Sequence, residues 1–334
     1  MAFLCIYCLR DSPTVTPSEA HIFPYVMGGT ETTEDTVCLS CNNLINERVE
    51  MPAFTSFLPF QSMFGIRGRR GSVQRVSGTL KIGDLERTVS LNARGEITDA
   101  VVFPGTDAQG KKTFYVCGPA ELVEAELRTL RQRYPDLKWE ETAPPGDDAQ
   151  VFVEMDTQLS RPELRRLAAK VAFERFAQLR RATFVADAEF DPVRKFILEG
   201  IEDTPICGVL SDRRLLEGPF RVIPLPCHAV YIISHPLDRV LGGFVSFYGL
   251  FWYWVILSRS YGALGQTDEL LVENPQAREA TNPLLRARTG TVRVPWDEVI
   301  SPYLRDPIGV EKTAMRYAKE KFQAAADAFY GPGG

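Results

Sequence analysis

Histidine is scarce in this chain of 334 residues, so imidazole chemistry can use only His21, His228 or His235. An excess of basic side chains is also lacking. The net charge is -5, which argues against non-specific binding of nucleic acid by the whole surface. The first residues, MAFLCIYC, contain neither a basic segment nor a long apolar core, and we therefore expect no secretory signal peptide.

A hydrophobic run long enough to span a membrane is missing as well. The most apolar stretch, VLGGFVSFYGLFWYWVIL at 240–257, is shorter than the ~20 residues that a membrane helix needs. It is also interrupted by Gly242, Gly243 and Gly249. We predict a pair of buried strands here and no contact with a membrane. The hydrophobic content of 45% and charged content of 24% are typical of a globular protein.

Cysteine is the residue whose placement carries most information. The chain has seven cysteines, and four of them form the pairs Cys5-x2-Cys8 and Cys38-x2-Cys41. Without an export signal we expect a reducing cytoplasm, where paired cysteines favour metal ligation over disulfides. Four thiolates complete the tetrahedral shell of a structural Zn²⁺ ion. Buried free cysteines or a redox pair are the alternatives, and the three isolated cysteines are expected to be core thiols.

The segment between the two cysteine pairs contains His21. A zinc ion with four cysteine ligands has no open position for catalysis, so any chemistry must come from this insert and the residues after it. On a strand, Glu19 and His21 would share one face and Ala20 would point away. Gly28-Gly29 then turns the chain, and the residues after Cys41, NNLINERVE, favour a helix.

This order of motifs resembles the HNH endonucleases. Their ββα-metal fold has a histidine on the first strand and an asparagine or histidine at the helix start. The likeness covers residues 5–50, where CxxC, EAHIFP, GG and CxxCNN follow one another. It implies an α+β chain with an N-terminal zinc-stabilised ββα-metal module followed by a larger mixed α+β region.

The resemblance also implies roles for individual residues. His21 stands where the family has a general base, and an unperturbed imidazole pKa of about 6.5 suits that role. Asp35 falls where a residue orients the base. Asn42 occupies the position that binds a catalytic Mg²⁺ or Mn²⁺ ion, and Glu19 could assist it. Many relatives have an acidic residue where this chain has Ala20. A structural histidine and a simple helix cap remain the alternatives for His21 and Asn42.

Three regions are predicted along the chain. The zinc-bound nuclease module covers 1–60, a small α+β region covers 61–150, and an α+β region of unknown specificity covers 151–334. The module has only two basic residues against seven acidic ones, so phosphate contacts need another source. The candidates for nucleic-acid binding follow the module directly: Arg67, Arg69, Arg70 and Arg75.

The C-terminal region is expected to contain helices and an antiparallel sheet. Helical spacing of apolar residues predicts a long helix after residue 160, and 205–258 has the β-branched and aromatic content of strands. The basic residues of the long helix are expected to form a solvated face, with a phosphate-facing surface as the alternative: Arg165, Arg166, Lys170, Arg175, Arg180 and Arg181. His228 and His235 are interpreted as core residues. No phosphate-binding glycine loop occurs in 151–334.

Taken together, these patterns predict a cytoplasmic, metal-dependent endonuclease that acts on DNA. RNA is the alternative substrate, and a homodimer is a further expectation. By analogy with the family, the biological role would be phage defence or restriction. The competing hypothesis is a zinc module that has lost its nuclease activity and binds nucleic acid or a protein partner.

Overall fold

The structure is a computed structural model of the chain. It describes residues 3–67, 75–82, 85–92, 96–106, 112–135, 149–152, 160–210, 216, 219–235, 239–261, 268–277 and 287–290. The chain divides into two compact units, one formed by Met1–Phe57 with Thr157–Gly334 and the other by Leu58–Asp156. The two units are described separately below.

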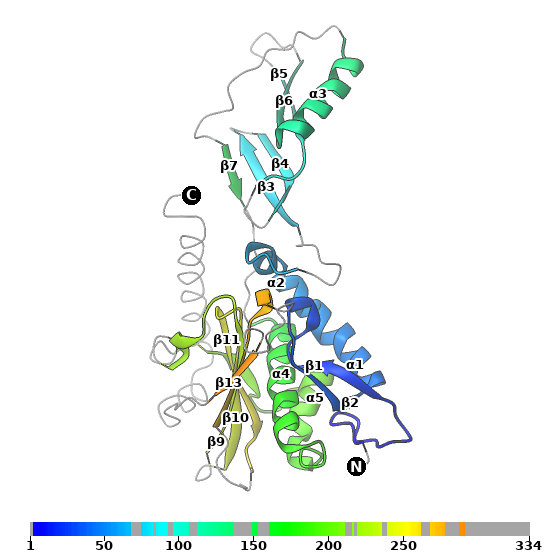
Figure 1. The fold of residues 1–334 in the computed structure, drawn as a ribbon, viewed down its shortest axis with the longest axis vertical. Helices are drawn as coiled ribbons and strands as arrows, with labels where there is room; N and C mark the ends of the chain where they lie inside the picture. The colour runs from blue at the N-terminus through cyan, green and yellow to red at the C-terminus, as the bar shows by residue number, and fades with distance from the viewer. Residues whose placement is uncertain are drawn as a thin grey trace. The chain divides into compact units, whose positions relative to one another are not determined.

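The N-terminal segment forms a strand, a turn, a strand and a helix (Figure 1). Strand β1 (Pro17–His21) pairs with β2 (Thr32–Cys38) in antiparallel orientation, and α1 (Leu39–Ile45) follows directly. His21 pairs with Thr32, and the register shifts between Ser18 and Ala20. A single turn of 3-10 helix, Tyr25–Met27, lies in the connection between the strands. The strand, turn, strand and helix predicted from the sequence are thus confirmed.

Gly28 and Gly29, in the connection between the two strands, are each required for a different structural reason. Gly28 has a φ of 92°, in the left-handed region that strongly favours glycine. A Cβ atom at Gly29 would lie 2.0 Å from the carbonyl oxygen of Phe23, so a side chain there would force the loop apart. The loop that follows His21 can therefore close tightly only with glycine at both positions.

The helix after the second cysteine pair continues beyond α1. A turn of π-helix, Asn46–Glu50, follows it, and α2 (Met51–Met63) then carries the chain onward. A π-type turn is wider than an α-helical turn and changes the direction of the side chains that follow it. Val49 is buried in this turn, and Glu50 is half-buried at its end.

A six-stranded sheet forms the core of the same unit. Its order is β13-β12-β9-β10-β11-β8, with every neighbouring pair antiparallel. The strands are β8 (Cys207–Val209), β9 (His228–His235), β10 (Val240–Phe247), β11 (Phe251–Ser258), β12 (Asp268–Glu273) and β13 (Ala287–Gly290). All of β11 and nearly all of β10 are buried, which confirms the prediction of paired buried strands. Among the described residues, no helix is long and apolar enough to cross a membrane.

Helix α4 (Pro162–Arg180) lies between this sheet and the N-terminal segment (Figure 1). It packs on β9, β10 and β11 on one side and contacts β2 and the π-turn on the other. Residues Leu167–Ala177 of the helix are all buried, because both sides are covered. Helix α5 (Asp191–Glu199) packs beside α4 and ends at Gly200, whose φ is 77°. Two short 3-10 helices, Ala188–Phe190 and Pro219–Val222, connect these elements, and a third, Pro275–Ala277, follows β12.

The second unit is a small α+β arrangement. It has a three-stranded sheet of order β4-β3-β7 and a hairpin of β5 and β6. Its elements are β3 (Val76–Ile82), β4 (Leu85–Leu91), β5 (Val101–Thr106), β6 (Lys112–Cys117), α3 (Ala120–Arg133) and β7 (Ala149–Phe152). Five buried residues form its core: Leu80, Val89, Leu91, Val101 and Phe103. The chain is therefore mixed α+β, as predicted.

Candidate active site and metal centre

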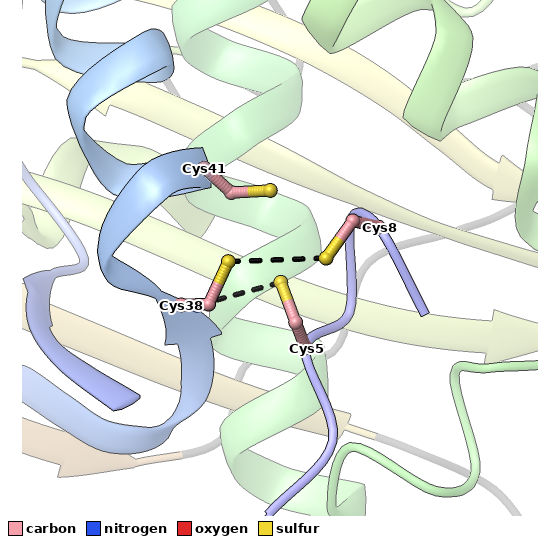
Figure 2. Close-up of side chains that lie close together, drawn as sticks. All are labelled: Cys5, Cys8, Cys38 and Cys41. Carbon is pink, nitrogen blue, oxygen red and sulfur yellow. Dashed lines mark hydrogen bonds between the residues drawn. The ribbon is translucent and has the colours of Figure 1, made fainter. Parts of the chain in front are cut away.

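The four cysteines of the CxxC pairs meet at one point. Cys5 and Cys8 precede β1, Cys38 ends β2, and Cys41 lies in the first turn of α1. Their sulfur atoms all lie within 4.8 Å of one another, and their side chains point toward a common centre (Figure 2). Three of the four side chains are buried, and Cys8 is half-buried.

The spacing of these sulfurs fits a zinc ion. Four bonds of ~2.3 Å to a tetrahedral zinc ion place neighbouring sulfurs about 3.8 Å apart, and the Cys8 and Cys38 sulfurs are 3.8 Å apart. The Cys38 N–H donates to the Cys5 sulfur at 3.4 Å. The pKa of the Cys5 thiol is lowered to about 4, first by a hydrogen bond from Cys41 and further by backbone N–H groups, although burial opposes this. The cluster is compatible with a structural zinc ion bound by thiolates.

His21 lies at the end of β1, where its side chain is half-buried. Its ring packs edge to face with Tyr25, with 5.2 Å between the ring centroids. Glu19 is exposed, whereas Ala20 is only 1% exposed. Glu19 and His21 therefore point to the outer side of the strand, and position 20 faces the core.

Asn42 connects the start of α1 to the same strand. Its Nδ2 atom donates to the Ser18 hydroxyl at 3.0 Å and to the Glu19 carbonyl oxygen at 3.1 Å. These two bonds use the amide nitrogen and leave the side-chain oxygen of Asn42 for another partner. The structure thus brings the start of α1 against the strand that carries Glu19 and His21.

Asp35 lies elsewhere on the hairpin. It is exposed on β2, and one of its carboxylate oxygens accepts a hydrogen bond from the Thr33 hydroxyl at 3.3 Å. Thr33 pairs with Ala20 and Val37 pairs with Ser18, so Asp35 lies in the bulged stretch of β2 that faces Glu19. The hairpin therefore places Asp35 across from the segment of β1 that carries Glu19 and His21.

The side chains beside His21 have the chemistry of a Mg²⁺ or Mn²⁺ site. Mg²⁺ binds oxygen ligands, and proteins hold it through one or two carboxylates while water and substrate phosphates complete its shell. The Glu19 carboxylate and the Asn42 side-chain oxygen are oxygen atoms of this kind, and the Asn42 amide nitrogen is bonded to the Glu19 main chain.

The arginine candidates belong to the unit formed by residues 58–156. Arg67 and Arg75 are exposed, and Arg75 forms an ion pair with Asp99 at 3.4 Å. Arg69 and Arg70 lie outside the described residues.

The prediction that the basic residues of α4 form a solvated face is wrong for two of them. Lys170 is 0% exposed and Arg175 is 6% exposed. Lys170 forms ion pairs at 2.9 Å with Glu50 and with Glu174. Its ammonium group also donates to the carbonyl oxygens of His21 and Ile22. The helix is buried on both sides, and its charges therefore pair inside the protein instead of facing water.

Three further side chains from the C-terminal part bind the backbone of the loop that follows His21. His228 contacts the Met27 carbonyl oxygen at 3.0 Å, and Gln178 donates to the Thr32 carbonyl oxygen at 3.2 Å. The Glu273 carboxylate accepts the Thr30 N–H at 2.6 Å. The sequence contains two local signals for these buried polar contacts. One is the i,i+4 spacing of Lys170 and Glu174, and the other is the isolated polar residues in strands β9 and β12.

His228 illustrates how such a contact is made in the core. Its prediction as a core residue is confirmed, because it is 0% exposed and stacks on Phe23 with 5.0 Å between ring centroids. The Tyr248 N–H donates to Nδ1 at 3.3 Å, so the proton resides on Nε2 and is donated to Met27. Burial lowers the pKa of His228 to about 4, and the ring is neutral near pH 7.

Glu273 makes the stability of the protein depend on pH. Burial raises the pKa of this carboxyl group to about 7 from an ordinary value of 4.5. Between these values the folded protein keeps a proton that the unfolded chain has released, so the contribution of Glu273 to stability falls as the pH rises through this window. Glu273→Gln keeps an oxygen acceptor for the Thr30 N–H, and its side chain does not titrate in this pH range.

We expect the drop in melting temperature between pH 5 and pH 8 to be smaller in Glu273→Gln than in the wild type. A difference of about 1 to 3 kcal/mol corresponds to roughly 3 to 8 °C. Glu269→Gln, which changes a half-exposed carboxylate on the same strand, serves as the control and should follow the wild type. Identical pH profiles for wild type and Glu273→Gln would contradict the prediction.

Comparison with known proteins agrees with this geometry. Residues 5–58 match the family model of the HNH endonuclease. No curated protein and no solved structure matches the chain. The match includes both cysteine pairs, His21 and Asn42, and it ends within α2. Residues 5–58 therefore form an HNH endonuclease domain, whose histidine-bearing loop is held by side chains from the C-terminal part of the chain.

Proposed function

We propose that the protein is a metal-dependent endonuclease that hydrolyses phosphodiester bonds of DNA. The observation that carries this proposal is the hydrogen bond from Asn42 to the Glu19 carbonyl oxygen. It places the start of α1 beside the strand that presents Glu19 and His21. In this proposal, His21 is the base, and Glu19 and Asn42 are the oxygen donors for a divalent ion.

In this proposal, His21 takes the proton from the water molecule that attacks phosphorus. General base catalysis of this kind contributes about 10² to 10⁴ in rate. Glu19 and Asn42 would hold a Mg²⁺ or Mn²⁺ ion, which when bound supplies positive charge to the scissile phosphate and the leaving oxygen. Asp35 would orient the base from its place on β2 across from Glu19. The four cysteines would hold zinc and maintain the frame.

Affinity for nucleic acid requires positive charge that the HNH domain lacks. Phosphate contacts depend on lysine and arginine, and residues 1–60 contain only Arg10 and Arg48 as basic residues. We propose that the predicted arginine cluster supplies the missing contacts. Such contacts would go to the DNA backbone and would carry little sequence information.

Ala20 bears on whether the site is active. Many relatives have an acidic residue at this position, and its absence would favour a module that binds without cutting. In this protein Ala20 is buried and pairs with Thr33, so the position faces the core. A ligand for the ion is needed on the other face of the strand, where Glu19 lies. Under the enzyme hypothesis, the exposed Glu19 would take the place of the missing acidic residue.

Nicking of supercoiled plasmid tests the proposal. The purified wild type should convert it to open circles in Mg²⁺ or Mn²⁺, and EDTA should stop the reaction. Asn42→Ala should need about 10-fold more metal for the same rate, as expected when metal coordination is weakened. Asn43→Ala, which changes the exposed neighbour in the same helix, should behave as the wild type.

Two further arms define the substrate. Single-stranded RNA should be cut more slowly than DNA, and chemical modification of the plasmid bases should change the rate if the enzyme serves restriction or phage defence. Binding of DNA without cutting in either metal would overturn the enzyme and would support the inactive binding module.

A further inference from the structure

The main chain at His21 is anchored from outside the HNH domain. The Lys170 ammonium group donates to the carbonyl oxygens of both His21 and Ile22, the latter at 3.1 Å. Lys170 comes from the middle of α4, 149 residues along the chain from His21, and its side chain is 0% exposed. A buried ammonium group therefore lies directly behind the strand that carries the proposed base.

The Lys170 ammonium group connects the backbone at His21 with the π-turn and with the next turn of α4. It pairs at 2.9 Å with Glu50, at the end of the π-turn, and with Glu174, one turn farther along α4. Glu174 in turn accepts the Tyr7 hydroxyl at 3.0 Å, and Tyr7 lies between the first two cysteines. Burial lowers the pKa of Lys170, but the two carboxylates raise it by more, and the net result is a pKa above the usual value. Lys170 is thus charged at neutral pH.

This arrangement is a costly way to obtain stability. Removing charged groups from water carries a large desolvation penalty, and burial raises the pKa of Glu174 to about 7. Well-packed apolar residues often stabilise a protein equally well. An apolar side chain cannot donate hydrogen bonds to two successive carbonyl groups, however. The specific contribution of the ammonium group is the fixed position of the His21–Ile22 backbone relative to the cysteine frame and the helix.

We propose that Lys170 is a positioning residue for the cleavage reaction. It acts through His21, whose main chain it fixes, and it makes the C-terminal part of the chain a component of the active site. The inference rests on the proposed nuclease function. Because a misplacement of about 1 Å in a reacting group can cost about 100-fold in rate, loss of this anchor should lower kcat and leave DNA binding nearly unchanged.

The test uses a variant in which Lys170 and its two carboxylate partners are all replaced by uncharged residues. Lys170→Met combined with Glu50→Gln and Glu174→Gln leaves no unpaired buried charge and should fold, with its zinc content and melting temperature close to those of the wild type. We expect kcat to fall about 10- to 100-fold, with KM for DNA changed by no more than about threefold. Lys170→Met alone removes the cation that pairs with the buried Glu174 and the half-buried Glu50, and it should also lower the melting temperature.

Arg165→Met is the matched control on the same helix. Arg165 pairs with Glu202 at 2.5 Å and donates to the Cys207 carbonyl oxygen, so its loss removes an ion pair without touching the His21 segment. Its kcat should equal that of the wild type. An equal loss of kcat in both variants would overturn the proposal, because the effect would then follow from general damage to α4.

Hydrogen exchange supplies a readout that does not need activity. The Ile22 N–H is bonded to the Glu31 carbonyl oxygen at 2.9 Å, and amides of residues 18–23 should exchange at least about 10-fold faster in the triple variant at unchanged global stability. Wild-type exchange together with wild-type kcat in that variant would overturn the inference. An inactive wild-type protein would overturn the nuclease function, and faster exchange would then still support the anchoring of His21 by Lys170.

Discussion

Replacement of His21 by alanine is expected to lower kcat for plasmid nicking by about 10² to 10⁴, the usual contribution of a general base. The side chain is half-buried at the end of β1, where its ring packs edge to face with Tyr25 within the hairpin. The Lys170 bonds go to backbone oxygens at positions 21 and 22, and alanine retains them. The fold, the zinc content and the affinity for DNA should therefore remain those of the wild type.

His235→Ala is the appropriate control, because it removes one of the other two histidines. His235 is at the far end of β9 from His228, which is roughly 23 Å along a strand, and it is His228 that contacts the His21 loop. Added imidazole should restore part of the activity of His21→Ala and have no effect on the wild type. Equal nicking by wild type and His21→Ala would show that another group acts as the base.

Replacement of Cys38 by serine is expected to have the largest effect on stability. A structural zinc ion contributes about 10 to 16 kcal/mol to the folding of small zinc modules, which is comparable to the whole stability of an ordinary domain. Cys38 joins β2 to α1, and its own N–H bonds to Cys5. Without the metal, the hairpin and helix have few local contacts to keep them in place.

The consequences should extend beyond the cysteines. Tyr7 would no longer be held against Glu174, and the partners of Lys170 and Glu273 in the hairpin would be lost. We expect Cys38→Ser to bind less than one zinc ion per chain, to expose the amides of residues 5–50 to exchange and to lose nuclease activity. The measurements are metal analysis, hydrogen exchange and circular dichroism.

Cys117→Ser provides the control for cysteine chemistry, since Cys117 is a half-buried thiol in the unit formed by residues 58–156. It should keep one zinc ion per chain and the wild-type stability. Wild-type protein that contains no zinc and is nevertheless folded would contradict the role assigned to the four cysteines.

Local spacing was sufficient for the features that depend on neighbouring residues. The CxxC pairs predicted the four-sulfur cluster, because each pair turns the chain within a few residues. The alternation at Glu19, Ala20 and His21 predicted which side chains face outward, because strands have a period of two. The apolar content of 240–257 predicted buried strands. Each of these inferences uses contacts over short stretches of sequence.

The charged residues of α4 show where such reasoning fails. A helix with lysine and arginine between apolar positions is normally assigned a solvated face, but α4 is covered by the sheet on one side and by the HNH domain on the other. Whether Lys170 meets water or Glu50 depends on the packing of segments more than a hundred residues apart. No periodicity within the helix contains that information.

The same distinction holds for the protein as a whole. The pattern of residues 5–58 predicted a four-cysteine cluster beside a hairpin and helix with an outward-facing histidine, because cysteine spacing and strand alternation are local features. Only the tertiary structure revealed that Lys170, His228 and Glu273 hold the backbone of that hairpin, so that residues 1–57 and 157–334 form one unit. The physical reason is that the backbone carbonyl and N–H groups of the loop are the same whatever the side chains are. Any buried donor or acceptor can bond to them, so the sequence does not indicate which one does.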